Sequence, residues 1–124
     1  MLVLGRLLAR YTYEILGLVP LFAEAEWNHT GTTVYTVKAK AFFKNGRSLN
    51  ITIKIYHLRN VGYSDAVIYA GRRAIKLDLS PRMFRSLSSV FKYLKKHLSS
   101  IYRDYEGLDR SRIRNHMRKL LKVS

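Results

Sequence analysis

Residues 34–43 alternate between apolar and polar side chains, and this period of two most constrains what the chain can fold into. One side of the pattern carries Tyr35, Val37, Ala39, Ala41 and Phe43, and the other carries Thr36, Lys38, Lys40 and Phe42. Successive side chains of a strand point to opposite faces of a sheet, so the pattern predicts a strand with one buried face. Residues 21–27 alternate in the same way and residues 28–33 resemble a turn, which together predict an antiparallel hairpin.

Other segments carry the three- and four-residue spacing of helices. The first comprises Leu4, Leu7, Leu8, Tyr11, Ile15 and Leu18. Gly17 and Pro20 are expected to end this helix. A second helix is expected to begin at Ser80-Pro81, an N-cap followed by proline at the first helical position. Its apolar face comprises Phe84, Leu87, Val90, Phe91, Leu94, Leu98 and Ile101. Gly107 then interrupts the chain, and Asp109 is expected to cap a last, basic helix.

Residues 44–62 fit two structures. The Asn45-Gly46 turn and the β-branched residues Ile51, Ile53 and Ile55 favour a strand. The spacing of Leu49, Ile53 and Tyr56 fits a helix, which Ser48 could cap and Gly62 could end. Periodicity does not decide between them. Two further short strands, 66–70 and 74–79, are expected around the turn Gly71-Arg72-Arg73.

The composition limits the partners and the chemistry. The chain has 124 residues, a formal net charge of +15 and no cysteine, which predicts a single domain without thiolate chemistry. Residues 81–124 carry 12 of the 23 basic residues and three of the eight acidic ones. An anionic partner would relieve the repulsion among these basic residues. The phosphate backbone of nucleic acid is the commonest such partner, and an anionic membrane surface is the second candidate.

The sequence contains no set of residues that we expect to catalyse a reaction or to bind a metal. His29, His57, His97 and His116 lack the spacing of metal ligands. Glu24 and Glu26 lie two apart on the first expected strand and could hold Mg²⁺. We interpret them instead as solvated residues that pair with Lys38 or Lys40 across the hairpin. We therefore expect no enzyme, no metal, no cofactor and no small-molecule substrate.

Two resemblances bear on the fold. The segment 15–19, Leu58-Arg59-Asn60-Val61-Gly62-Tyr63 and the segment 74–91 together resemble a half-domain of the LAGLIDADG homing endonucleases. This resemblance implies an order helix–hairpin–helix–hairpin–helix, with a four-stranded sheet that saddles a duplex. Pro20, Leu21 and Phe22 stand where that family places its metal-binding acid, which implies binding without cleavage. Segment 7–27 with Tyr35-Thr36-Val37 resembles a double-stranded-RNA-binding domain, although Ser64-Asp65-Ala66 replaces that family's paired lysines.

We therefore expect one α+β domain of the order helix–β-hairpin–helix–β-hairpin–helix, with a four-stranded antiparallel sheet and a basic C-terminal helix pair. Residues 1–105 would form the nucleic-acid-binding core, and residues 106–124 a basic helix packed on it.

The expected function is non-catalytic binding of structured RNA, most concretely as a cytoplasmic ribosomal or ribosome-associated protein that contacts rRNA and neighbouring ribosomal proteins, without a membrane. The alternatives are a DNA-binding protein and a metal-dependent homing-type endonuclease. The expected phosphate contacts are Lys38, Lys40, Arg72, Arg73, Arg85, Lys92, Lys96, Arg103, Arg110, Arg112, Arg114, Arg118 and Lys119.

Overall fold

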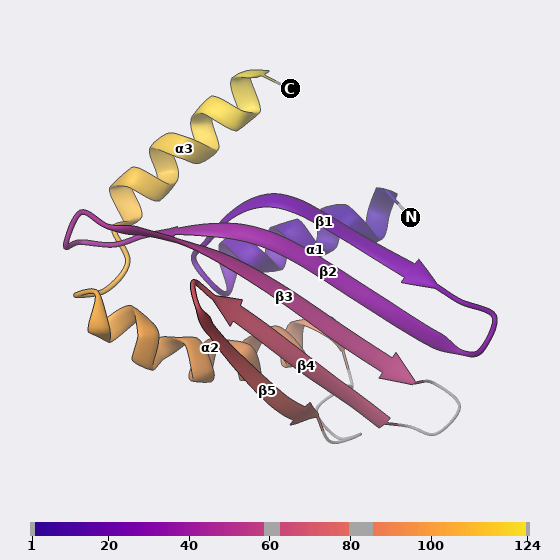
Figure 1. Cartoon of the computed structure of the whole chain (residues 1–124). Coiled ribbons are helices and arrows are strands. Elements are labelled where there is room, and N and C mark those ends of the chain that lie inside the picture. The colour runs from indigo at the N-terminus through magenta and orange to yellow at the C-terminus, as the bar shows by residue number, and fades with distance from the viewer. Residues whose placement is uncertain (1, 59–62, 80–85, 124) are drawn as a thin grey trace.

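A computed structural model describes residues 2–58, 63–79 and 86–123 and places them in a five-stranded antiparallel sheet with three helices. The elements are α1 (Leu2–Glu14), β1 (Val19–Trp27), β2 (Thr32–Phe42), β3 (Ser48–Leu58), β4 (Tyr63–Ala70), β5 (Arg73–Leu79), α2 (Leu87–Asp104) and α3 (Arg110–Val123). The strands lie in the order β1-β2-β3-β4-β5, so each strand pairs with its neighbours in sequence (Figure 1). The α+β class predicted from the sequence is confirmed.

The prediction of a helix within residues 44–62 is wrong, because residues 48–58 form β3 in the centre of the sheet. Ile51, Ile53 and Ile55 alternate with polar residues, and all three are at most 1% exposed. Tertiary pairing decides the ambiguity, since β3 forms ladders with both β2 and β4. Gly46, with a φ of 88°, supports the turn between β2 and β3. The expected order helix–β-hairpin–helix–β-hairpin–helix and the expected four-stranded sheet are therefore wrong: five consecutive strands lie between α1 and α2.

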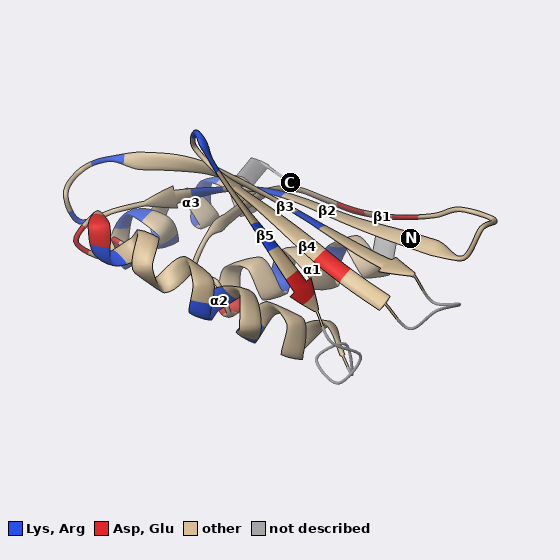
Figure 2. Cartoon of the chain, turned by 60° about the horizontal axis from the view of Figure 1, so that its bottom comes forward, with Lys and Arg blue, Asp and Glu red and all other residues tan. Residues whose placement is uncertain are grey.

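Helices α1 and α2 cover one face of the sheet, and the main core lies between these helices and the sheet. Alternate side chains of β2, including Val37, Ala39 and Ala41, join this core, together with Phe91, Leu94 and Leu98 of α2. The predicted faces of β2 and of α2 are thus confirmed. Figure 2 shows both helices on the same side of the sheet. The opposite side, which we call the open face, presents Lys38 and Lys40 of β2.

The chain reverses between α1 and β1 through a glycine turn. The N–H of Gly17 donates to the carbonyl of Tyr13 at 3.1 Å, and the N–H of Leu18 donates to Thr12 at 3.1 Å. Gly17 has a φ of 70°, which suits glycine at the end of a helix and confirms its predicted role. Pro20 lies within β1 rather than at the end of α1, so that part of the prediction is wrong.

A β-bulge changes the expected pattern of β1. The register with β2 shifts between Pro20 and Phe22, which leaves Leu21 without a partner residue on β2. The alternation of residues 21–27 predicts that Leu21 shares the face of Ala23 and Ala25, yet Leu21 is 56% exposed. Bulges re-aim side chains in this way.

The start of α2 also differs from the prediction. The N-cap of α2 is Ser86: its side chain accepts from the N–H of Ser89, and the Ser89 side chain accepts from the N–H of Ser86. Ser80, Pro81 and Phe84 lie outside the described residues. The predicted cap of the last helix is confirmed, because Asp109 accepts from the N–H of Arg112 through its carboxylate at 3.2 Å.

The linker between α2 and α3 carries the chain around one end of the sheet. Phe43 forms an isolated bridge with Leu108, and the N–H of Asp109 donates to the carbonyl of Phe42 at 2.7 Å. As a result α3 packs on a second, smaller core made of Val19, Phe42 and Ile113. Val19 and Phe42 point to the open face, because Val19 pairs with Lys40 and Phe42 is two residues further along β2.

Candidate nucleic-acid interface

Charge is distributed unevenly along the strands of the open face (Figure 2). The acidic residues Glu24, Glu26, Asp65 and Asp78 lie toward the end with the turn between β1 and β2. At the other end, basic residues of β2, of two turns and of α3 gather. We call this group the basic end; it comprises Lys40, Lys44, Arg47, Arg72, Arg110, Arg112, Arg114, Arg118 and Lys119. The basic end therefore attracts a polyanion, whereas toward the opposite end Lys54 and Lys76, in the same register row as Glu24, offset part of the acidic charge.

Phe42 is the point at which α3 and the sheet meet. The ring is 4% exposed, and the imidazole of His116 stacks on it at a centroid distance of 4.1 Å. The guanidinium carbon of Arg112 lies 4.8 Å from the ring centroid, and the Nζ of Lys40 lies 5.6 Å from it. These distances are typical of cation–π contacts. One aromatic ring thus contacts a cation from α3 and a cation from β2.

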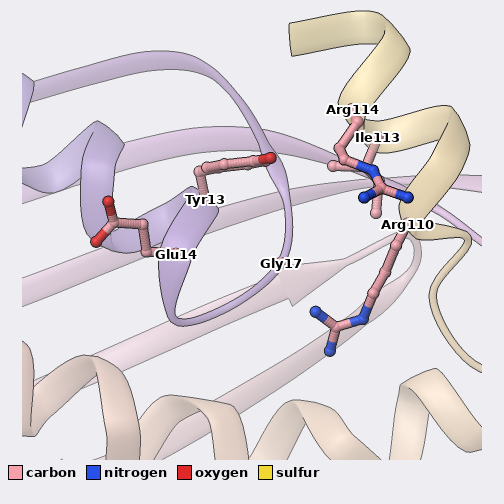
Figure 3. Close-up of a pocket in the computed structure, with 6 residues that line it drawn as sticks. All are labelled: Tyr13, Glu14, Gly17, Arg110, Ile113 and Arg114. Carbon is pink, nitrogen blue, oxygen red and sulfur yellow. The ribbon is translucent and has the colours of Figure 1, made fainter.

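Arg110 and Arg114 occupy the other flank of α3, one helical turn apart. They line a pocket of about 280 Å³ together with Tyr13, Glu14, Gly17 and Ile113 (Figure 3). The hydroxyl of Tyr13 points toward α3, whereas the Glu14 side chain points away from it (Figure 3). Glu14 is paired with Arg10 of its own helix at 3.2 Å. The two arginines are therefore available to an anion.

Among the described side chains, none of residues 110–120 in α3 forms a salt bridge. The two salt bridges of the described residues join Arg10 to Glu14 and Arg73 to Asp104. The helix sequence RSRIRNHMRKLLKV holds no acidic residue, and the carboxylate at its N-terminus is that of the capping Asp109. Arg110, Arg114 and Arg118 are spaced at i, i+4 and i+8, so their like charges repel one another. This repulsion is the kind that a bound anion relieves.

The structure brings together only part of the predicted phosphate-contacting set. Lys40, Arg112 and Lys119 gather around Phe42 and the space beside it, and Arg110 and Arg114 line the pocket on the other flank of α3. Arg118 is exposed on the same helix. Lys92, Lys96 and Arg103 are exposed along α2, which covers the other side of the sheet. Arg72 lies in the turn between β4 and β5 and belongs to the basic end, whereas Arg73 is paired with Asp104. Lys38 is exposed on the open face, with its Nζ 5.7 Å from the ring centroid of Phe22. Arg85 lies outside the described residues.

Four basic or aromatic residues of this region were missed by the sequence reasoning. Lys44 and Arg47 flank the turn that brings them to the basic end, and the Asn45-Gly46 signal between them could have located them. His116 was seen only as an isolated histidine, and Phe42 only as one aromatic among many. Nothing in the sequence indicates that their rings stack, because the contact joins residues far apart in the chain.

In the described part of the chain, no group of three or more His, Cys, Asp or Glu side chains comes together to hold a metal ion. Glu24 lies opposite Thr36 and Glu26 opposite Val34, so their predicted pairing with Lys38 or Lys40 is wrong. Asp65 lies directly opposite Asp78. Tyr63 donates to Asp78 at 3.1 Å, and this hydrogen bond, together with the charge of Asp78, raises the pKa of Tyr63.

Comparison with known proteins identifies no relative: no protein-family model, no curated protein and no solved structure matches the chain. In addition, none of the helices in residues 2–14, 87–104 and 110–123 is long and apolar enough to cross a membrane.

Proposed function

We propose that this protein binds structured RNA without catalysis, through phosphate contacts at the basic end, and that it works within a ribonucleoprotein such as the ribosome. The observation that carries the proposal is α3, a docked helix with many basic side chains and no acidic one. Its cations lie beside those of β2 and of the β2–β3 turn, so several segments can contact one phosphate backbone. Such contacts position a protein on nucleic acid without reading its sequence.

The packing of α3 supports binding rather than a merely solvated helix. Ile113 is 3% exposed in the small core, and Arg112 and Lys40 both contact the ring of Phe42. The cations are thus attached to a fixed surface, and ordering them on binding costs less entropy than ordering free side chains.

The salt dependence of RNA binding tests the proposal. Affinity for a labelled hairpin RNA is measured over a range of KCl concentrations for the native chain and two triple variants. The first variant, Arg114→Gln/Arg118→Gln/Lys119→Gln, removes charge from α3. The second, Lys92→Gln/Lys96→Gln/Arg103→Gln, removes the same charge from α2 and serves as the matched control.

We expect the α3 variant to reduce the slope of log affinity against log salt by roughly two to three, since each phosphate contact contributes about 0.7 to 0.9. The α2 variant is expected to leave the slope within about one of the native value. Equal slopes for the native chain and the α3 variant would place the contact elsewhere. A native chain that binds no RNA at low salt would refute the function itself.

A further inference from the structure

We infer that the groove between α3 and the β1–β2 edge of the open face receives a single unpaired base of the bound RNA. The groove has a volume of about 340 Å³ and is lined by Val19, Leu21, Lys40, Phe42, His116, Lys119 and Leu120. This inference rests on the proposed RNA binding and deepens it. A volume of about 300 Å³ is at the small end of the range for ligand pockets, which suits one planar ring rather than a longer chain.

Two exposed leucines make the groove unusual for a surface so close to a polyanion site. Leu21 comes from β1 and is 56% exposed, while Leu120 comes from α3 and is 44% exposed. The bulge after Pro20 accounts for the exposure of Leu21. Leaving both side chains in water forgoes the stabilisation that their burial would give. A flat apolar ring placed between them would bury both.

The charges at the groove select a nucleotide over an uncharged apolar ligand. Lys40 of β2 and Lys119 of α3 both line the groove, and none of its lining residues is acidic. A base that enters carries a phosphate on each side, and two lysines from different elements are suited to meet them. Proteins bind unpaired RNA bases by this combination of apolar surface and cationic surroundings.

Phe42 and His116 are structural parts of the groove rather than stacking platforms. Their rings are stacked on each other at 14°, and Phe42 is 4% exposed, so its faces are already in contact. The base would instead lie between the aliphatic side chains, so we expect the gain per base to fall toward the low end of the range for stacking.

The test compares three hairpin RNAs of the same stem: fully paired, with one bulged 2-aminopurine, and with an abasic site in place of that base. Affinities are measured by anisotropy, and the 2-aminopurine fluorescence reports whether the base leaves water. We expect the native chain to bind the bulged RNA roughly fivefold to tenfold more tightly than the abasic RNA. The fluorescence is expected to change on binding.

The double variant Leu21→Ala/Leu120→Ala should lose this preference and keep its affinity for the fully paired hairpin. Trp27→Ala is the matched control, since Trp27 is 53% exposed at the other end of β1. It should retain the preference of the native chain.

Equal affinity for the bulged and abasic RNAs would overturn the inference and leave the proposed function standing. Binding to phosphatidylserine vesicles that requires Leu21 and Leu120, without a preference for the base, would assign the groove to a lipid and also overturn it. Failure to bind any of the three RNAs would overturn both proposals.

Discussion

The imidazole of His116 lies on the ring of Phe42, with 4.1 Å between ring centroids and 14° between ring planes. The contact joins α3 to the last residue of β2 and so connects the C-terminal helix to the sheet. Ile113 and Val19 complete the same small core. The position of every cation on α3 therefore depends on a few side chains that lie apart from the main core.

Phe42→Ala is expected to destabilise the protein by about 3 kcal/mol, because it removes a buried aromatic side chain and leaves a cavity under α3. Urea unfolding measures this loss, and amide hydrogen exchange in α3 shows where it acts. His116→Ala is expected to cost about 1 kcal/mol, since it removes only the stacked ring. Unchanged protection of the α3 amides in Phe42→Ala would show that the small core does not hold the helix.

The sequence identified the elements with a clear period and missed those that depend on distant partners. The alternation of β2 and the buried face of α2 follow from local pattern alone, and both are confirmed. Residues 48–58 satisfy both periods, and only pairing with β2 and β4 makes them a strand. The bulge at Leu21 arises from a register shift between two strands, which one strand's sequence does not show.

The candidate site shows the same division. The basic helix could be read directly from the sequence, because charge and composition are local properties. The groove beside it could not, because β1, β2 and α3 meet there only after the linker has passed around the end of the sheet. Lys92 and Lys96 have the same local character as the α3 cations, yet the fold places them on a different side.

Ser86→Ala is expected to lower the free energy of unfolding by about 1 kcal/mol, which is typical for the loss of an N-cap. The Ser86 side chain accepts from the N–H of Ser89 at 3.2 Å, and alanine would remove this hydrogen bond. Ser100→Ala serves as the control, since Ser100 is an exposed serine in the interior of α2. Equal stability of the two variants in urea would mean that the capping box contributes little.

Tyr102 contributes to the free energy of unfolding, and this contribution is lost at high pH. Burial raises the pKa of Tyr102, and its hydroxyl donates to the carbonyl of Leu16 at 2.9 Å. The folded state keeps this proton when the unfolded chain loses it, near the ordinary tyrosine pKa of about 10. The contribution is therefore complete below that pKa, and it decreases as the pH rises above it.

Urea unfolding from pH about 8 to about 11 tests this linkage. In Tyr102→Phe the free energy of unfolding should be about 1 kcal/mol lower at pH 8, because the hydrogen bond is lost. It should then fall less steeply above pH 10 than in the native chain. Tyr69→Phe, a change at an exposed position, is the control. Parallel pH profiles for the native chain and Tyr102→Phe would contradict the assignment.

Sedimentation of a native cell extract tests whether the RNA partner is ribosomal. At low salt we expect the native chain to migrate with a ribosomal subunit, and ribonuclease treatment should release it. The variant Arg114→Gln/Arg118→Gln/Lys119→Gln should dissociate at a lower salt concentration than Lys92→Gln/Lys96→Gln/Arg103→Gln, because fewer phosphate contacts mean weaker binding at every salt concentration. Migration as free protein in all conditions would exclude the ribosome, and release by deoxyribonuclease alone would identify DNA as the partner.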